Sequence, residues 1–303
     1  MRIVVHGQQA FGKAVLEALL DRGEEVVAVY VAPDKESRPD PLKAAALKRG
    51  LPVHQPGSYK KAEVGDEFRA LRSDLCVMAF VTLIVPEEFL DIPTYGTIQY
   101  HPSLLPKHRG PSSINWPLIQ GETRTGLSIF WPDNGLDTGP NLLQKEVEIG
   151  PDETLGSLYF DKLFPMGVEA TIEAVDLVRD HKAPKIAQDE SQATYEGWCR
   201  ASDVEIDWKQ PVADVYNLIR GADPQPGAWT RLNGETLQVF AARQQVGVGG
   251  LPGEVTQIKD EGVVVAANGG EILVGRVRAG DGTKMPAREF VDASGLREGA
   301  RLG

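Results

Sequence analysis

Three polar side chains, Gln99, His101 and Asp137, have the types and the spacing that acyl transfer requires. Gln99 and His101 are two residues apart in a segment that stops at Pro102, so on a strand their side chains share one face. Asp137 follows in a glycine-flanked loop, residues 135–139. An amide can donate to a developing oxyanion, an imidazole can move protons, and a carboxylate can orient and stabilise that imidazole. The three residues therefore predict a catalytic site.

The other histidines carry weaker signals. His108 is expected to make a loop contact or to face solvent. His6 ends the first apolar segment and is expected to be packed in the core, whereas His54 and His181 lack polar neighbours that would suggest a role. His101 is therefore the histidine that we assign to catalysis.

Nucleotide and metal sites are not indicated. Residues 7–12 resemble a dinucleotide-binding loop but lack its Gly-x-Gly-x-x-Gly pattern, so we expect a close turn from strand to helix. The sequence has no complete Gly-x-x-x-x-Gly-Lys-Ser/Thr phosphate loop, because Ala14 follows Lys13, and no clustered histidines, cysteines or carboxylates suggest a metal.

Alternating strands and helices must position the predicted site. The pattern predicts strands at residues 2–5, 25–31, 74–80, 95–101 and 127–131, with helices at residues 11–22, 40–49 and 112–120. This alternation of strands and helices predicts a mostly parallel, doubly wound α/β sheet, whose ligands bind beyond the carboxyl ends of its strands. His101 lies at such an end.

The second half of the chain changes character. A long amphipathic helix is expected at residues 154–181, interrupted at residues 165–167 by a proline and a glycine, and residues 182–203 read as a polar linker. A helix at 212–219 precedes short strands at 236–241, 253–258, 262–266 and 271–277, which predict a small barrel or sandwich. We thus expect a first domain at residues 1–203 and a second at 204–303, with residues 297–303 frayed.

Composition limits the class of protein. With 303 residues, 42% hydrophobic and 25% charged, the chain is typical of globular proteins with one large domain or two. The net charge of −11 disfavours polyanionic partners. No signal-peptide pattern occurs, and no apolar run reaches the roughly 18 residues of a membrane helix. Cys76 and Cys199 are the only cysteines, and two reduced thiols favour a cytoplasmic location. The oligomeric state stays open.

With these residues in view, the chain resembles the formyltetrahydrofolate-dependent formyl transfer family, which contains methionyl-tRNA formyltransferase, sugar-amine N-formyltransferases and the hydrolase domain of 10-formyltetrahydrofolate dehydrogenase. Two motifs carry the resemblance, His-Pro-Ser-Leu-Leu-Pro-x-x-Arg-Gly from His101 and Asp-x-Gly-Leu-Asp-Thr-Gly from Asp133. The similarity to the hydrolase domain extends to residues 98–102, 114–116, 130–131, 193–197, 219–221 and 226–229.

The resemblance implies a Rossmann-like catalytic domain and a small OB-like barrel, with 10-formyltetrahydrofolate as co-substrate and no metal. It places His101 and Asp137 on the family's catalytic histidine and aspartate. It also implies a folate pocket made largely of backbone, formed by Phe80, Val81, Leu83, Ile84, Val85, Pro86, Ser103, Leu104, Asp133, Gly135 and Leu136.

Two departures bear on the formyl acceptor. Transferases of the family carry asparagine two positions before the histidine, and the hydrolase domain carries an aliphatic residue, whereas this chain has Gln99. The tRNA enzymes have a longer basic loop where residues 32–40 are short and balanced in charge. From Val204 onward the chain has 11 basic and 13 acidic residues, although a tRNA-binding barrel should be basic. Formylation of initiator tRNA is therefore disfavoured.

Several readings stay open at this point. Water, a carrier group or a small amine could accept the formyl group. The chain could be part of a larger dehydrogenase, whose carrier and aldehyde-oxidising domains do not fit in 303 residues, or a free-standing relative. A folate-binding relative with a decayed site is a non-enzymatic alternative, which the presence of both His101 and Asp137 disfavours.

Overall fold

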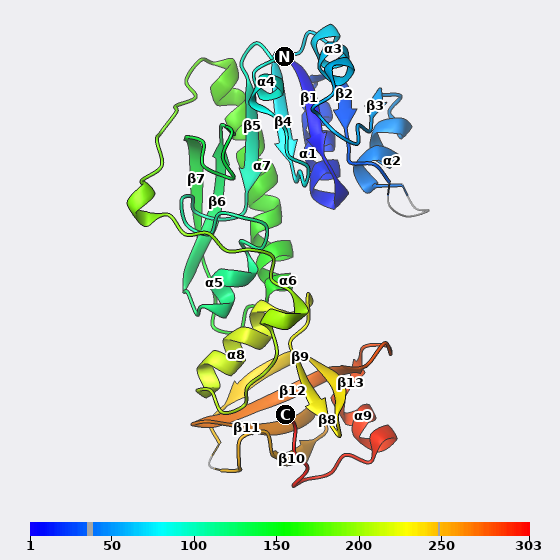
Figure 1. The fold of residues 1–303 in the computed structure, drawn as a ribbon, viewed down its shortest axis with the longest axis vertical. Helices are drawn as coiled ribbons and strands as arrows, with labels where there is room; N and C mark the ends of the chain where they lie inside the picture. Colours follow the sequence, from blue (N-terminus) through cyan, green and yellow to red (C-terminus); the bar gives the residue numbers. More distant parts are fainter. Residues whose placement is uncertain (35–38, 248) are drawn as a thin grey trace. The chain divides into compact units, whose positions relative to one another are not determined.

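The computed structural model describes residues 1–34, 39–247 and 249–303, which form two compact units (Figure 1). The first unit contains residues 1–110, 126–147 and 161–195, and the second contains residues 111–125, 148–160 and 196–303. Each unit has its own hydrophobic core. Part of the 32–40 loop, residues 35–38, lies outside the described residues, and a domain boundary at residue 203 stays a prediction.

The first core is built on a seven-stranded sheet with the order β3-β2-β1-β4-β5-β6-β7. Its strands are β1 (Arg2–Gly7), β2 (Glu25–Tyr30), β3 (Val53–His54), β4 (Leu75–Ala79), β5 (Thr97–His101), β6 (Arg124–Phe130) and β7 (Asn141–Glu148). Strands β1 to β5 pair in parallel, and β6 runs antiparallel to β5. The predicted mostly parallel sheet is confirmed, although the sequence pattern does not predict β3, β7 or the direction of β6.

Helices cover both faces of this sheet (Figure 1). One face packs against α1 (Gln9–Asp21), α2 (Pro41–Lys48) and α7 (Phe164–Arg179), and the other packs against α3 (Ala62–Ala70) and α4 (Glu87–Leu90). Ile98 and Tyr100 of β5 belong to the first of these layers. Because side chains alternate along a strand, Gln99 and His101 point to the opposite face.

A close turn joins β1 to α1. A Cβ atom on Gly7 would lie 2.1 Å from the carbonyl oxygen of Ala79, so only glycine allows this approach to the end of β4. The amide of Gln8 donates to the same carbonyl at 3.2 Å. The segment at residues 7–12 is therefore the predicted turn from strand to helix.

The helical region at residues 154–181 is interrupted earlier than predicted. It consists of α6 (Leu155–Ser157), a π-helical turn (Leu158–Leu163) and α7. The predicted interruption at residues 165–167 lies directly after the change from the π-helical turn to α7, and Pro165 is in the first turn of α7. Gly167 instead allows close packing, since a Cβ there would lie 2.6 Å from the ring of Tyr100.

The second unit contains an antiparallel sheet with the order β10-β11-β12-β9-β8, and β13 pairs with β12. Its strands are β8 (Trp229–Leu232), β9 (Glu235–Gln245), β10 (Val255–Lys259), β11 (Gly262–Ala267), β12 (Gly270–Ala279) and β13 (Met285–Pro286). Its helices include α5 (Asn115–Ile119), α8 (Val212–Gly221) and α9 (Ala287–Ser294). The predicted second domain of antiparallel strands is confirmed.

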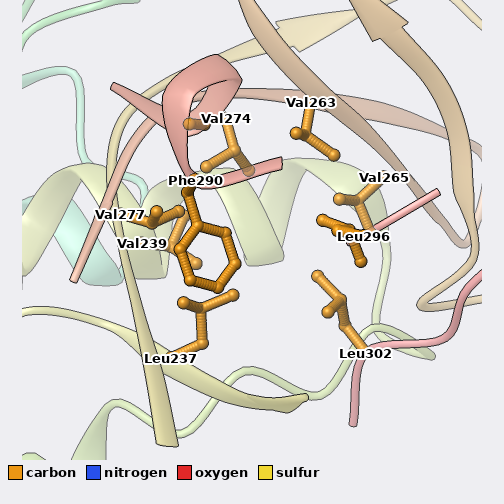
Figure 2. A pocket seen from close by; sticks show the side chains of 10 residues that line it. Leu237, Val239, Val263, Val265, Val274, Val277, Phe290, Leu296 and Leu302 are labelled. Atoms are coloured by element: carbon orange, nitrogen blue, oxygen red, sulfur yellow. The ribbon is translucent and has the colours of Figure 1, made fainter. Parts of the chain in front are cut away.

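Apolar side chains from this sheet meet α9 and the C-terminal segment (Figure 2). Leu237, Val263 and Phe290 line a cavity of about 10 Å³ together with Leu302. A space of this size is at the lower limit for one water molecule, and its lining offers no polar partner. The cavity is therefore part of the core and not a ligand site.

The expectation that residues 297–303 fray is wrong. The amide of Val255 donates to the carbonyl of Ala300 at 2.8 Å, that of Leu302 to Gly253 at 2.8 Å, and that of Gly303 to Arg231 at 2.9 Å. The Leu302 side chain is buried. Backbone pairing and an apolar anchor outweigh the chain entropy of this segment, and a composition-based reading does not detect such contacts.

Candidate active site

The last residue of β5, His101, is buried, and its two ring nitrogens face different groups. Its Nε2 atom lies 2.9 Å from the carbonyl oxygen of His108. Because a carbonyl can only accept, Nε2 carries the hydrogen in this contact. In the neutral ring, Nδ1 then presents its lone pair, and this atom lies 3.6 Å from an Oδ2 atom of Asp137. The two predicted catalytic side chains are thus brought together.

Asp137 lies in the loop between β6 and β7 and is also buried. Its Oδ2 atom accepts a hydrogen bond from the amide of Gly110 at 2.9 Å. Its φ of +57° is uncommon for a residue with a side chain and must be maintained by the surrounding structure. Phe80 and His108 also have positive φ, at 65° and 53°. Such conformations cluster at functional sites.

Gln99 is half-buried in β5, two residues before His101, as the sequence predicts. It pairs with Phe130 of β6 on one side and with Met78 of β4 on the other. Its amide therefore reaches the same face of the sheet as the imidazole of His101, where it could donate to a bound substrate.

The residues expected to contact folate lie at the ends of strands β4, β5 and β6. The apolar side chains of Phe80, Ile84 and Leu136 are 45%, 87% and 54% exposed. Asn134 donates to the carboxylate of Glu87, which joins the 133–137 loop to the segment that follows Pro86. Exposed apolar side chains on neighbouring loops are typical of a ligand-binding surface.

Other expected folate contacts are engaged within their own loops. The hydroxyl of Ser103 is buried and donates to the carbonyl of Lys107 at 2.6 Å. Asp133 accepts from the amide of Gly135 at 3.0 Å and from the hydroxyl of Thr138 at 2.6 Å. Val81, Leu83, Val85, Pro86 and Leu104 are half-buried, and Gly135 is exposed.

The sequence pattern does not predict the peptide that joins the side chains of His101 and Asp137. His108 is buried instead of solvated, and it acts through its carbonyl group, while Gly110 acts through its amide. Backbone groups have no signature in residue types, so no sequence signal marks these two contacts. Arg109 between them is buried and bound to Gln188 and Glu190. This guanidinium is therefore engaged by side chains of the protein itself.

His6 is packed in the core, as expected. Its Nε2 atom lies 2.7 Å from the hydroxyl oxygen of Tyr59, while Nδ1 has no hydrogen-bond partner among the described residues. Burial lowers the pKa of His6 to about 3. The ring is therefore neutral at physiological pH, which matches its apolar surroundings.

Within residues 1–34, 39–247 and 249–303, no cluster of three or more histidine, cysteine or carboxylate side chains could hold a metal ion. The same residues contain no helix that combines the length and the apolar character needed to span a bilayer. Both cysteines are free thiols.

Two family models match the chain. The model described as formyl transferase matches residues 1–175, and the one described as formyl transferase, C-terminal domain, matches residues 199–295. The chain is 40% identical over 305 residues to the mitochondrial 10-formyltetrahydrofolate dehydrogenase of Homo sapiens, covering 96% of this chain and 33% of that protein. It thus spans about a third of the length of this relative.

A second relative is covered almost completely. The methionyl-tRNA formyltransferase of Geobacter sulfurreducens is 38% identical over 309 residues, which cover 100% of this chain and 97% of that protein. Among solved structures, HypX from Aquifex aeolicus in complex with tetrahydrofolic acid has a TM-score of 0.71 at 20% identity, covering 96% of this chain and 47% of that one. This last likeness concerns the fold alone. Together with the two family matches, these similarities show that the chain belongs to the formyl transferase family of enzymes.

Proposed function

We propose that this chain transfers the formyl group of 10-formyltetrahydrofolate to water or to a small amine, with His101 and Asp137 as its catalytic residues. The observation that carries the proposal is the fixed imidazole of His101, held between the carbonyl of His108 and the carboxylate of Asp137. This arrangement supports the proposal because the imidazole can accept a proton and the nearby carboxylate can stabilise the imidazolium that forms.

The reaction begins with attack of the nucleophile on the carbon of the N10-formyl group. The carbonyl electron pair moves to oxygen, and the resulting oxyanion receives a hydrogen bond from the Gln99 amide or from protonated His101. Nδ1 of His101 accepts the proton of the nucleophile, directly or through Asp137, and the carboxylate stabilises the imidazolium. When the bond from carbon to N10 breaks, this proton goes to N10 and tetrahydrofolate leaves.

Replacement of the two catalytic side chains tests the proposal. His101→Ala and Asp137→Ala should each lower turnover at least about a hundredfold, because proton transfer contributes roughly 10²–10⁴ to such rates. Binding of a non-reactive folate analogue, measured by calorimetry, should stay within about threefold of the wild-type value. Wild-type turnover in either variant would end the proposal, and tight folate binding with no turnover in the unaltered protein would favour the folate-binding alternative.

The nature of the acceptor requires a separate measurement. Formate release without added amine identifies water, and formate suppressed by a candidate amine, with formylated amine as product, identifies an N-formyltransferase. For a carrier group, the corresponding test adds a carrier protein in excess and measures whether the formyl group is transferred to it.

We also propose a cytoplasmic location, which the two reduced thiols favour.

Methionyl-tRNA is a second candidate acceptor, favoured by the nearly full-length similarity to the Geobacter sulfurreducens relative. Against it stands the acidic balance from Val204 onward, with 11 basic and 13 acidic residues. Phosphate contacts dominate tRNA affinity and make it depend steeply on salt. Formylation of methionyl-tRNA that falls steeply between 50 and 200 mM salt would select this candidate; no formyl-methionyl product would remove it.

A further inference from the structure

Gln188, in the polar segment after α7, connects the catalytic loop to a buried arginine. Its side-chain nitrogen donates to the carbonyl oxygens of Asp137 at 2.9 Å and Gly139 at 2.7 Å. Its side-chain oxygen accepts from Nε of Arg109 at 3.2 Å and from Nη2 at 2.8 Å. Both donors and both acceptor positions of this amide are therefore used.

Arg109 is fixed in turn by Glu190, two residues after Gln188. The Nη2 atom of Arg109 lies 2.7 Å from Oε1 of Glu190, and Nη1 lies 3.0 Å from Oε2. Hydrogen bonding to Arg109 lowers the pKa of Glu190 below its usual value. A planar two-point contact of this kind fixes the direction of the guanidinium as well as its position.

The residues 188–195, which we call the strap, also hold the peptide that joins the catalytic side chains. The amide of Arg109 donates to the carbonyl of Thr194 at 3.1 Å, and the amide of His108 donates to the Thr194 hydroxyl at 2.8 Å. The Thr194 amide donates to the carbonyl of Pro106 at 3.2 Å. The strap therefore contacts both the Asp137 loop and the peptide on which His101 and Asp137 depend.

We propose that Gln188 is a positioning residue that holds the Asp137 carboxylate at Nδ1 of His101, an inference that rests on the proposed function. Asp137 has a positive φ, a conformation that persists only where its surroundings enforce it. Gln188 binds the carbonyl group of this same residue. Without its donors the loop can relax, and a displacement of about 1 Å can lower a rate about a hundredfold.

The replacement Gln188→Glu tests the two N–H donors of the Gln188 side chain separately from its acceptor oxygen. Glutamate has nearly the same shape and keeps two acceptors for Arg109, but it presents an anionic oxygen to the carbonyls of Asp137 and Gly139. The matched control is Gln192→Glu, which adds the same charge at an exposed position of the strap, where the side-chain amide donates to the hydroxyl of the neighbouring Ser191. Gln188→Ala removes the donors without adding charge, in case the glutamate variant fails to fold.

We expect at least a tenfold lower turnover in Gln188→Glu and Gln188→Ala, with the dissociation constant of a folate analogue within threefold of wild type. The ¹⁵N signal of His101 Nδ1, assigned by comparison with His101→Ala, should shift in both variants and not in Gln192→Glu. Turnover of the Gln188 variants within twofold of Gln192→Glu would overturn the inference. It would also be overturned if turnover fell in proportion to the loss of thermal stability while the ¹⁵N signal of His101 stayed unchanged. Active His101→Ala and Asp137→Ala proteins would instead overturn the proposed function itself.

Discussion

Nδ1 of His101 lies 3.6 Å from Oδ2 of Asp137, although the two residues come from different strand ends of the first unit. One short peptide holds both: the carbonyl of His108 binds the imidazole, and the amide of Gly110 binds the carboxylate. The relative position of the imidazole and the carboxylate is therefore set by two backbone groups of one short peptide, whose separation the covalent chain limits. Such a pair is preorganised for a reaction in which charge develops between them.

Gln99 should determine how strongly the oxyanion is stabilised and which nucleophile is used. Gln99→Leu removes the amide at similar size and should lower turnover by up to about 10²–10³, the loss typical of one oxyanion donor. Gln99→Asn restores the residue that the family's transferases carry, with a reach shorter by one methylene. Measuring formate and formylated amine together gives the division of formyl transfer between water and amine. If both the turnover and this product ratio were unchanged in the two variants, a role for the Gln99 side chain would be contradicted.

His6 should make the protein less stable in acid. Its folded-state pKa of about 3 lies below the ordinary value of 6.5, so between these pH values the unfolded chain binds the additional proton. The free energy of unfolding should therefore decrease as pH falls below 6.5 and stop decreasing from this cause below about pH 3. The loss should reach up to about 2 kcal/mol at pH 5, at about 1.4 kcal/mol per pH unit.

Urea unfolding of His6→Gln at pH 7 and pH 5 measures this contribution. The variant can retain a hydrogen bond to Tyr59 but has no proton to gain, so its stability should fall less between the two pH values. His181→Gln is the matched control because His181 is exposed. Equal pH dependence in His6→Gln and in the wild type would show that His6 does not titrate in this manner.

Leu302 should stabilise the second unit although it is the penultimate residue. Its side chain is 6% exposed and lines the apolar core together with Phe290 (Figure 2). Leu302→Ala should lower the free energy of unfolding by about 2–5 kcal/mol, the usual cost of a buried leucine. Leu251→Ala, at a side chain that is 61% exposed, should change it by less than about 0.5 kcal/mol. Hydrogen exchange of the β9 and β12 amides gives the measurement, and similar values for both variants would contradict the anchoring of this segment.

The sheet and the proximity of His101 to Asp137 could be predicted because residue type encodes them. Apolar runs such as residues 74–80 indicate buried strands. The spacing of Gln99 and His101 indicates two polar side chains on one face of a strand. Strand β7, by contrast, was not distinguishable from a loop, because its alternation of buried and polar residues includes several charged ones. Local pattern cannot reveal the partner that makes such a strand stable.

What could not be predicted depends on tertiary contacts of the main chain. Gln188 stands in a polar stretch that resembles a linker, and only the fold brings it to the carbonyl groups of Asp137 and Gly139. The ordered C-terminal segment has the same origin, since its bonds to β10 and β8 involve amides and carbonyls. In each of these contacts at least one partner is a main-chain amide or carbonyl group, which composition does not describe.

The hydrogen bonds from the peptide of residues 108–110 have a practical consequence for mutational surveys. Systematic alanine replacement at His108 would leave its carbonyl in place, and Gly110 has no side chain to remove. Both residues have a positive φ and His108 is buried, so alanine at either position would also change packing or backbone conformation and would not isolate these hydrogen bonds. Replacing an amide by an ester through chemical ligation at residue 110 would delete the bond itself, and it is this kind of atomic substitution that can measure what the main chain contributes to the site.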